Sequence, residues 1–385
     1  MINEHLYKNL EKRIISQNNR FKISQKDIIE LKESFKNKVV LISGAAGSIG
    51  SEFTKDLIKF NFQIKKIILL DKDENMLTEI NRELLLYKNF NKKNIKFVCA
   101  DINSIDIQDI LTKEKVQFYI NFAAIKHVRS EENIYSIKYM FKTNSINFLP
   151  KKKGKLEKFF SISTDKTVNP SSILGVSKNL MEQNLSRFSK NILFVSSVRF
   201  ANVSFSNGSI LKYIVDRLNQ KKSFGVPKNI RRFFITHSEA SSLCYKSLLK
   251  RNNNKILIPN PKILRKDLLI MNLAEKIVKK YNLIPKFYKK KKSTTYIRNF
   301  CYILLTAISD GQKSYEELYS DSETLQCDID NTVCKVDLPV YSKKIQFLLN
   351  KIIKSNDIQS LKILIKKTFK NYQSPKKFIK ISKTI

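Results

Sequence analysis

From residue 38 onward, the chain alternates between short apolar runs and segments in which apolar residues recur at helical spacing. The runs predict buried strands, and the spaced segments predict helices. This alternation predicts an α/β fold with a doubly wound parallel sheet that carries helices on both faces. The expected strands are 39–43, 66–70, 95–100, 118–122, 158–162 and 192–198, and the expected helices are 51–60, 74–87, 105–111, 136–147 and 176–188.

The two ends of the chain differ from this central α/β domain, which we place at 38–200. Residues 1–37 have apolar residues at helical spacing, which predicts lead helices that pack on the body or mediate self-association. After residue 200 the elements become shorter and irregular, so we expect a smaller C-terminal substrate-binding lobe over 201–340, partly interleaved with the first domain. Residues 341–385 are expected to form a helical extension with a loose tail.

Composition narrows the class of protein. The 385 residues carry a formal net charge of +38, but the lysines are dispersed and no nucleic-acid-binding motif accompanies them, so no nucleic-acid partner is expected. The three histidines are too scattered for a metal site, and the five cysteines lack a CxxC pair, which predicts reduced thiols and no disulfide. No signal-peptide pattern and no apolar run of about 18 residues occurs. We therefore expect a soluble, cytoplasmic protein without an integral membrane segment.

A glycine-rich turn separates the first expected strand from the first expected helix. It reads Gly44-Ala-Ala-Gly47-Ser48-Ile49-Gly50. The first glycine permits a tight turn, the second lets the backbone approach a pyrophosphate, and the third lets the helix pack on the strand. Asp71 ends the second strand, where it would bond ribose hydroxyls, while the neighbouring Lys72 would suit a 2′-phosphate. The pattern predicts a Rossmann-type site for NAD or NADP and leaves the choice between them open.

Further small and polar residues follow the next two strands. Asp101 and Ile102 follow the third strand and are placed to meet an adenine, although Asp101 would equally cap the next helix. Ala123 and Ala124 follow the fourth strand and allow close approach of a cofactor. Lys126 comes next and is a candidate contact for a substrate or phosphate.

The fifth strand is followed by the most informative stretch of the chain. Asp165 and Lys166 are adjacent side chains that give and take protons, and Lys178 lies in the helix that follows. The end of a parallel strand is where an α/β enzyme places its chemistry. The stretch therefore predicts a catalytic centre.

Together these motifs resemble the extended short-chain dehydrogenase/reductase superfamily. Within it they are most similar to the CapD-like polysaccharide biosynthesis group, which includes the UDP-N-acetylglucosamine 4,6-dehydratases. The resemblance spans residues 38–335 in order. It is carried by segments 44–50, 123–128, 142–144, 163–166, 169–170, 175–178, 199–203, 232–240 and 311–318.

The resemblance implies a 4,6-dehydratase that acts on a UDP-linked N-acetylhexosamine such as UDP-N-acetylglucosamine, for surface polysaccharide biosynthesis. It implies that Asp165 is the acid and Lys166 the base, that Thr164 holds the 4-hydroxyl of the sugar, and that Lys178 binds the nicotinamide ribose. Burial would have to raise the pKa of the acid, and burial or nearby cations would have to lower that of the base. The other implied contacts are Asn144 for the cofactor and Lys126, His127, Asn202 and Arg232 for the substrate.

Two departures from the family pattern leave alternatives open. Leu174 stands where the wider superfamily has a proton-accepting tyrosine, so the first oxidation needs another acceptor, such as Asp165 or water. Residues 309–313 read Ser-Asp-Gly-Gln-Lys in place of Arg-Pro-Gly-Glu-Lys, which removes an arginine suited to a diphosphate. The alternatives are an epimerase on the same scaffold and a catalytically silent sugar-nucleotide-binding protein; the Asp165–Lys166 pair favours dehydration. A homo-oligomer is expected.

Overall fold

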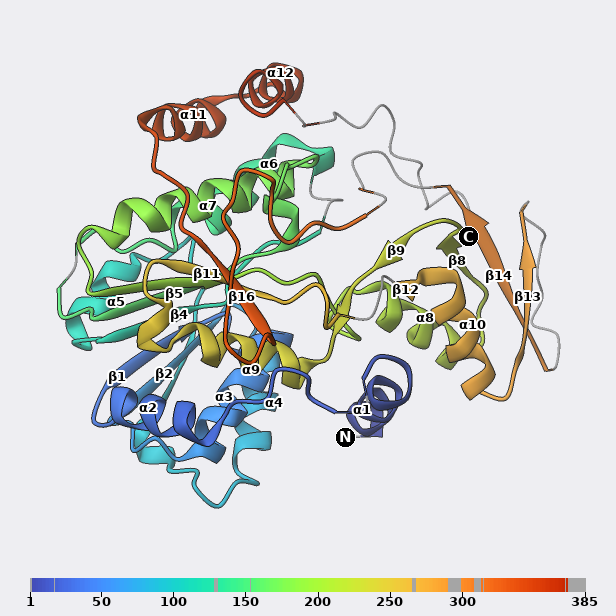
Figure 1. The fold of residues 1–385 in the computed structure, drawn as a ribbon, viewed down its shortest axis with the longest axis horizontal. Coiled ribbons are helices and arrows are strands. Elements are labelled where there is room, and N and C mark those ends of the chain that lie inside the picture. Colours follow the sequence, from blue (N-terminus) through green and yellow to red (C-terminus); the bar gives the residue numbers. More distant parts are fainter. Residues whose placement is uncertain are drawn as a thin grey trace.

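The computed structural model describes residues 2–16, 18–127, 131–152, 154–264, 268–289, 299–307, 313, 315–370 and 372. Within them, nine strands form the sheet at the centre of the larger lobe, in the order β15-β16-β11-β6-β5-β4-β1-β2-β3 (Figure 1). Neighbours from β11 to β3 are parallel, and β16 and β15 add an antiparallel edge. The strands are β1 (Val39–Ser43), β2 (Lys66–Asp71), β3 (Ile95–Cys99), β4 (Phe118–Asn121), β5 (Lys158–Ile162), β6 (Phe194–Val198), β11 (Lys255–Pro259), β15 (Gln326–Cys327) and β16 (Val333–Asp337).

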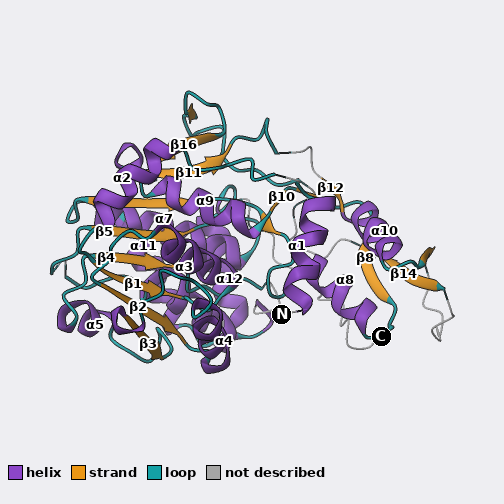
Figure 2. Ribbon diagram, turned by 90° about the horizontal axis from the view of Figure 1, so that it is seen from below, coloured by secondary structure: helices purple, strands orange, loops and turns teal. Residues whose placement is uncertain are grey.

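Helices cover both faces of this sheet, which confirms the predicted doubly wound fold (Figures 1 and 2). One face carries α2 (Gln25–Phe35), α3 (Ser48–Phe60), α4 (Glu74–Leu84) and α9 (His237–Ser247). The other carries α5 (Ile107–Lys113), α6 (Ile134–Phe141) and α7 (Ile173–Ser189). The short helical turns are η1 (Lys92–Asn94), η3 (Lys142–Ile146), η4 (Asp165–Thr167) and η5 (Lys250–Asn252).

The continuous apolar runs are explained by this double cover. Side chains of a strand alternate between the two faces of the sheet. In β1, Val40 and Ile42 join the core beneath α3 and α9, whereas Val39 and Leu41 join the core beneath α5 and α7. Because both faces are buried, every position of the strand is apolar or small.

The smaller lobe packs around its own apolar core (right side of Figure 1). A parallel three-stranded sheet, in the order β13-β14-β8, lies against two helices, and two short strand pairs connect the lobes. Leu211, Ile277 and Ile303 are fully buried there. The elements are α8 (Ile210–Asn219), α10 (Ile270–Lys280), β8 (Phe224–Pro227), β13 (Ile284–Tyr288) and β14 (Phe300–Thr306), with the pairs β7 (Asn202–Val203) with β10 (Phe234–Ile235) and β9 (Arg231–Arg232) with β12 (Leu268–Leu269).

The N-terminal segment packs on the body, as its spacing predicted. Leu10 and Ile14 of α1 (Ile2–Ile14) are buried in the core of the smaller lobe. The connection to α2 is fixed by Arg20, whose Nε lies 2.7 Å from a carboxylate oxygen of Glu239 on α9. Glu239 is fully buried, so this ion pair anchors the segment to the sheet-covering helix.

Two C-terminal helices lie on the outer side of α6 and α7 (top of Figure 1). They are α11 (Lys343–Lys354) and α12 (Ile358–Thr368). Leu348 and Leu361 are buried against Ile137 of α6 and Leu180 of α7. The tail expected to be loose, 374–385, lies outside the described residues. None of the helices in the described ranges is long and apolar enough to cross a bilayer.

The prediction that all five cysteines are reduced thiols was wrong. Cys327 and Cys334 form a disulfide that links β15 to β16. The turn between these strands brings the two residues directly opposite each other in the antiparallel register, with their Cα atoms 3.8 Å apart. The two cysteines are separated by 7 positions in the sequence, so they do not form the CxxC pattern on which the prediction depended. Cys99 is a free, exposed thiol, and Cys244 and Cys301 are free and buried.

Candidate active site

The predicted site residues converge on one edge of the main sheet. The order of the strands reverses between β4 and β1, whose carboxyl ends lie side by side. In open α/β sheets, ligands bind at this reversal. The glycine turn follows β1, and the Asp165–Lys166 turn follows β5, the neighbour of β4.

The three glycines of the turn have different surroundings. A Cβ on Gly44, whose φ is +68°, would lie 2.5 Å from the backbone nitrogen of Ala123, and one on Gly50 would lie 2.2 Å from the carbonyl oxygen of Gly44. A Cβ on Gly47 would meet only that same oxygen, at 3.3 Å. Packing within the protein therefore requires Gly44 and Gly50. At Gly47, which precedes α3, the crowding by the protein is milder, and the absence of a side chain would also allow the backbone to approach a pyrophosphate.

Asp71 braces the glycine turn from the end of β2. Its Oδ2 accepts a hydrogen bond from the backbone N–H of Ala46 at 3.0 Å, and its Oδ1 accepts one from the N–H of Asp73 at 3.2 Å. The carboxylate is half-buried and retains lone pairs for a ribose. Asp71 therefore lies beside the glycine turn, and its contact with a ribose stays a prediction.

Lys72 and Asp101 are joined through Tyr139 of α6. The Tyr139 hydroxyl donates to Oδ2 of Asp101 at 2.6 Å, and the ammonium of Lys72 lies 3.3 Å from that hydroxyl and 5.3 Å from the ring centroid. Asp101 does not cap the following helix, since Asp106 caps α5. Ile102 is buried in the core and presents no side chain to a ligand.

Asn144 lies in η3, a π-helical segment that continues α6. Its Oδ1 accepts from the backbone N–H of Ile125 at 2.8 Å, and its Nδ2 donates to the Ile125 carbonyl and to Ser177 Oγ, each at 2.9 Å. Such π-bulges are frequent at functional sites. Here the amide fixes the backbone just after Ala123 and Ala124, so Asn144 shapes the segment expected to face the cofactor.

Lys126 and His127 follow this segment and are exposed. Desolvation by the surrounding chain lowers the pKa of Lys126. The ring of His127 packs against Gly208, where a Cβ would come within 2.2 Å of it. His127 thus connects the sheet edge to the loop before α8, which agrees with a structural part for this ring.

The predicted catalytic turn, η4, is compact and internally bonded. Thr164 donates its hydroxyl to Oδ1 of Asp165 at 2.7 Å, and the Lys166 ammonium lies 3.1 Å from the same oxygen. Asp165 is 3% exposed, and the Lys166 side chain is about one-third exposed. The Thr164 hydroxyl and the Lys166 ammonium therefore both contact the same carboxylate oxygen of Asp165, at the end of β5.

The charge state of Lys166 differs from what its expected role requires. Burial acts to lower the pKa of Lys166, but the negative charges of Asp165 and Glu316 outweigh it, so the pKa lies above that of an ordinary lysine. A base at this position would need a lowered value. The rise comes first from the neighbouring Asp165, and the charge of Glu316, from a distant segment of the chain, adds to it.

Lys178 lies beneath the turn, on α7. Its ammonium donates to the carbonyl oxygen of Ile162, the last residue of β5, at 2.9 Å. Burial lowers the pKa of Lys178 to about 8, although the charge of Glu182 opposes the change. Lys178 therefore joins α7 to the active edge of the sheet, next to Thr164 and Asp165.

Leu174 is buried in the first turn of α7 and contributes only its backbone to the polar network. Its N–H donates to Oε1 of Glu131 at 3.0 Å. Glu131 is fully buried, and burial raises its pKa. The nearby ammonium of Lys362 on α12 shows that this carboxylate faces the outer helices. Glu131 caps α7 and does not replace the missing tyrosine.

Glu316, for which the sequence pattern predicted no role, connects two predicted substrate contacts. Its Oε1 accepts from Nδ2 of Asn202 at 2.7 Å and lies 3.1 Å from Nε of Arg232. Its Oε2 accepts from the backbone N–H of Phe233 at 3.1 Å. Burial raises the pKa of Glu316 to about 7; the charge of Asp165 adds to the rise, and the charges of Lys166 and Arg232 oppose it.

A second buried ionic network lies behind the catalytic turn. Arg199 donates to both oxygens of Glu182, at 2.8 and 2.7 Å, and to both oxygens of Glu323, at 3.0 and 2.8 Å. Glu182 also accepts from the hydroxyl of Ser163 at 2.5 Å. This network joins Arg199, which directly follows β6, to Glu182 of α7 and to Glu323. It therefore also fixes Ser163, the residue before Thr164.

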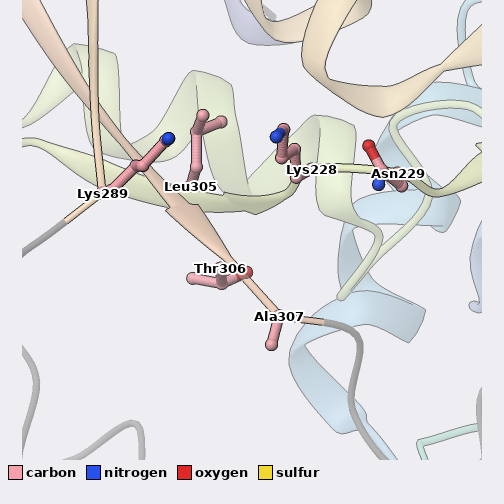
Figure 3. A pocket seen from close by; sticks show the side chains of 6 residues that line it. All are labelled: Lys228, Asn229, Lys289, Leu305, Thr306 and Ala307. Atoms are coloured by element: carbon pink, nitrogen blue, oxygen red, sulfur yellow. The ribbon is translucent and has the colours of Figure 1, made fainter.

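A pocket in the smaller lobe contains none of these residues (Figure 3). It lies where β8 and β14 end, and a backbone hydrogen bond of 3.2 Å from Lys228 to Thr306 forms part of its wall. Its lining residues are Lys228, Asn229, Lys289, Leu305, Thr306 and Ala307. The Asp165–Lys166 turn and the glycine turn both lie elsewhere, on the main sheet.

Comparison with known proteins places this architecture in a family. The model of the family described as "Polysaccharide biosynthesis protein" matches residues 40–336. The chain belongs to this family. It is 31% identical over 308 residues to the capsular polysaccharide biosynthesis protein CapD of Staphylococcus aureus, a match that covers 77% of this chain and 47% of CapD. The predicted resemblance to the CapD-like group is thereby confirmed.

Two further likenesses concern proteins named as dehydratases. The UDP-N-acetylglucosamine 4,6-dehydratase (inverting) of Campylobacter jejuni is 27% identical over 259 residues, covering 63% of this chain and 74% of that protein. The structure of a dTDP-glucose 4,6-dehydratase from Streptomyces venezuelae with NAD bound has a TM-score of 0.51 and 16% identity, covering 70% of this chain and 88% of that one. The latter confirms the fold. The chain spans about half the length of CapD.

Proposed function

We propose that this protein is a nucleotide-sugar 4,6-dehydratase that removes water from UDP-N-acetylglucosamine for polysaccharide biosynthesis. The observation that carries the proposal is the Asp165–Lys166 pair, an acid and a base 3.1 Å apart on the turn after β5. The similarity to the Campylobacter jejuni dehydratase supports the same reaction. A cytoplasmic location and self-association remain parts of the proposal.

The glycine turn supports NAD or NADP as the cofactor. Gly47 leaves room for a pyrophosphate before the N-terminus of α3, and Asp71 lies beside it with lone pairs for ribose hydroxyls. A nicotinamide bound there would supply the chemistry of hydride transfer, for which carbon 4 of the sugar would be the donor and carbon 6 the final acceptor. Lys178, held at the end of β5, is suited to the ribose next to the nicotinamide.

The shared oxygen of Asp165 accounts for the missing tyrosine. The 4-hydroxyl of the sugar, held by Thr164, loses its proton through the Thr164 hydroxyl to Asp165 as carbon 4 is oxidised. Asp165 is then protonated and gives that proton to the hydroxyl leaving carbon 6. Lys166 takes the proton from carbon 5, which the adjacent ketone has made acidic, and returns it when hydride reaches carbon 6. The balance is loss of one water, with the cofactor regenerated.

The electrostatics of Lys166 predict the pH dependence of this reaction. A lysine acts as a base only when neutral, and the pKa of Lys166 lies above the ordinary lysine value. The turnover rate should therefore rise with pH through the neutral range, by up to about tenfold per pH unit. A flat rate between pH 6.5 and 8.5 would show that Lys166 is not the base.

The direct test is incubation of the protein with UDP-N-acetylglucosamine and NAD or NADP, followed by mass spectrometry for loss of one water and by absorbance of the 4-keto product in alkali. Asp165→Asn and Lys166→Met should each slow dehydration by about 10²–10⁴-fold, the usual contribution of a general acid or base. Lys166→Met should also suppress deuterium exchange at carbon 5. Cofactor affinity should stay near the wild-type value, because the glycine turn is untouched.

A matched control is the exposed pair Asp109 and Lys113 on α5, whose charged atoms are 3.6 Å apart. Asp109→Asn and Lys113→Met make the same chemical changes at a surface pair that is worth little to the fold. Both controls should retain full turnover. Near-full activity of Asp165→Asn and Lys166→Met would refute the assignment, inversion without water loss would indicate an epimerase, and net reduction of the cofactor would indicate a dehydrogenase.

A further inference from the structure

The catalytic turn is not the only charged group at the active edge of the sheet. Glu316 belongs to an irregular segment after the smaller lobe, far along the chain from Asp165 and Lys166, yet their charges act on its carboxylate. Its side chain is 4% exposed. A carboxylate withdrawn from water to this extent is costly unless it has a full set of donors.

Glu316 has such a set, drawn from two other segments. Asn202, Arg232 and the backbone of Phe233 all donate to it, at 2.7 to 3.1 Å. Arg232 is further fixed by a 3.0 Å hydrogen bond from Nη2 to the carbonyl of Lys313, close to Glu316 in the chain. One carboxylate therefore joins β7, β9 and the segment after β14.

We propose that Glu316 is a positioning residue of the dehydratase reaction, which holds Asn202 and Arg232 in place for the UDP-sugar and sets the charge balance of Asp165 and Lys166. This inference rests on the proposed function and extends it to a residue outside the predicted set. A group that acts in both ways has two separable effects. Its shape governs how well the substrate binds, and its charge governs the pH at which Lys166 becomes neutral.

Two substitutions separate these effects. Glu316→Gln keeps the size but removes the charge and one acceptor, so the KM for the UDP-sugar should rise about tenfold. The negative charge of Glu316 raises the pKa of Lys166, so its loss should move the acid limb of the kcat–pH profile down by about one unit. Glu316→Asp keeps the charge but is too short for all three donors. It should raise KM and leave the limb near its wild-type position.

The other charged groups that face Glu316 are constant in this experiment, because Asp165, Lys166 and Arg232 are unchanged in both variants. The matched control is Glu317→Gln, which makes the same change one residue later, where the side chain is about half exposed. This control should leave KM and the pH profile unchanged. If Glu316 only supported the fold, Glu316→Gln would lower the thermal stability without moving the acid limb of the kcat–pH profile.

The inference and the proposed function fail in different ways. If the wild-type protein removes no water, the proposed function is wrong. The positioning role is then tested by calorimetric titration with UDP, in which Glu316→Gln should have about tenfold lower affinity for UDP than Glu317→Gln. If the wild-type protein is active but Glu316→Gln shares its KM and its pH limb, the inference alone is overturned. An unchanged UDP affinity in an inactive protein overturns both.

Discussion

The glycine turn offers a comparison in which two similar substitutions have opposite consequences. Gly47→Ala places a methyl 3.3 Å from the Gly44 carbonyl oxygen, a tight contact that a shift of a few tenths of an ångström relieves. The backbone there has φ −67° and ψ 164°, which alanine adopts readily. Gly50→Ala places the same methyl 2.2 Å from that oxygen, well inside van der Waals contact.

The expected magnitudes follow from these distances. Gly50→Ala forces a backbone shift, and overpacking of this kind costs about 1–3 kcal/mol of stability. For Gly47→Ala, the loss of a preferred residue before the helix costs about 0.5–1 kcal/mol, and the reduced freedom of the unfolded chain offsets a similar amount. The methyl of Gly47→Ala instead meets the cofactor, where the same overpacking would weaken binding roughly 10–100-fold.

Thermal unfolding with and without cofactor measures both effects. At about 100 times its Kd, a cofactor should stabilise the wild-type protein by about 2.7 kcal/mol, whereas a variant with about 100-fold weaker binding should gain only about 0.4 kcal/mol. Without cofactor, Gly47→Ala should unfold at about the same temperature as the wild-type protein, and Gly50→Ala should unfold at a lower temperature. A folded Gly47→Ala protein that binds NAD and NADP with wild-type affinity would show that the turn does not hold a pyrophosphate.

Three further predictions concern other parts of the structure. Because burial lowers the pKa of Lys178 to about 8, its charge destabilises the fold below that pH, and the penalty fades as pH rises towards the unfolded value. Lys178→Met should thus be inactive yet about 2 kcal/mol more stable to urea at pH 7, with the gain shrinking above pH 8. Arg20→Ala leaves Glu239 as an unpaired buried charge and should cost about 3–5 kcal/mol, whereas Arg82→Ala at an exposed pair should cost at most about 1 kcal/mol in the same urea titration. Lys72→Glu should weaken NADP binding at least about tenfold and spare NAD, as titration with both cofactors would show; equal losses would place Lys72 away from the 2′-phosphate.

The sequence predicted β1 to β6 of the main sheet, most of which are buried on both faces, but it did not predict β11, β15 and β16. An apolar run such as Val39–Ser43 leaves few alternatives to a central strand, and the helices between the runs follow from their spacing. The smaller lobe was not predictable in this way. Strands of two residues, such as β7 and β9, are too short to show a period, and the pairing of β8 with β14 joins residues far apart in the chain.

The same distinction, between local patterns and contacts distant in the sequence, applies to the residues of the candidate site. Groups that directly follow a strand, such as Gly44 and Asp165, were located from the sequence because parallel strands end at one edge of the sheet. Glu316 follows no predicted element, and its partner Asn202 lies 114 residues away. The raised pKa of Lys166 has one cause that the sequence shows, the adjacent Asp165, and a smaller one, Glu316, that comes from a contact which no local pattern records.

The late arrival of β11 and β16 in the sheet has a consequence for the biosynthesis of the chain. Six parallel strands are complete in sequence at Val198, but the outer edge of β6 is covered only by β11, which begins at Lys255, and β16 follows at Val333. During translation, the largely apolar sheet therefore waits with the edge of β6 open, in addition to the edge at β3, while the segments of the smaller lobe are synthesised. An open edge of this kind recruits any strand that reaches it. The nascent chain is thus most exposed to mispairing between these two points, and chaperone demand should be concentrated there.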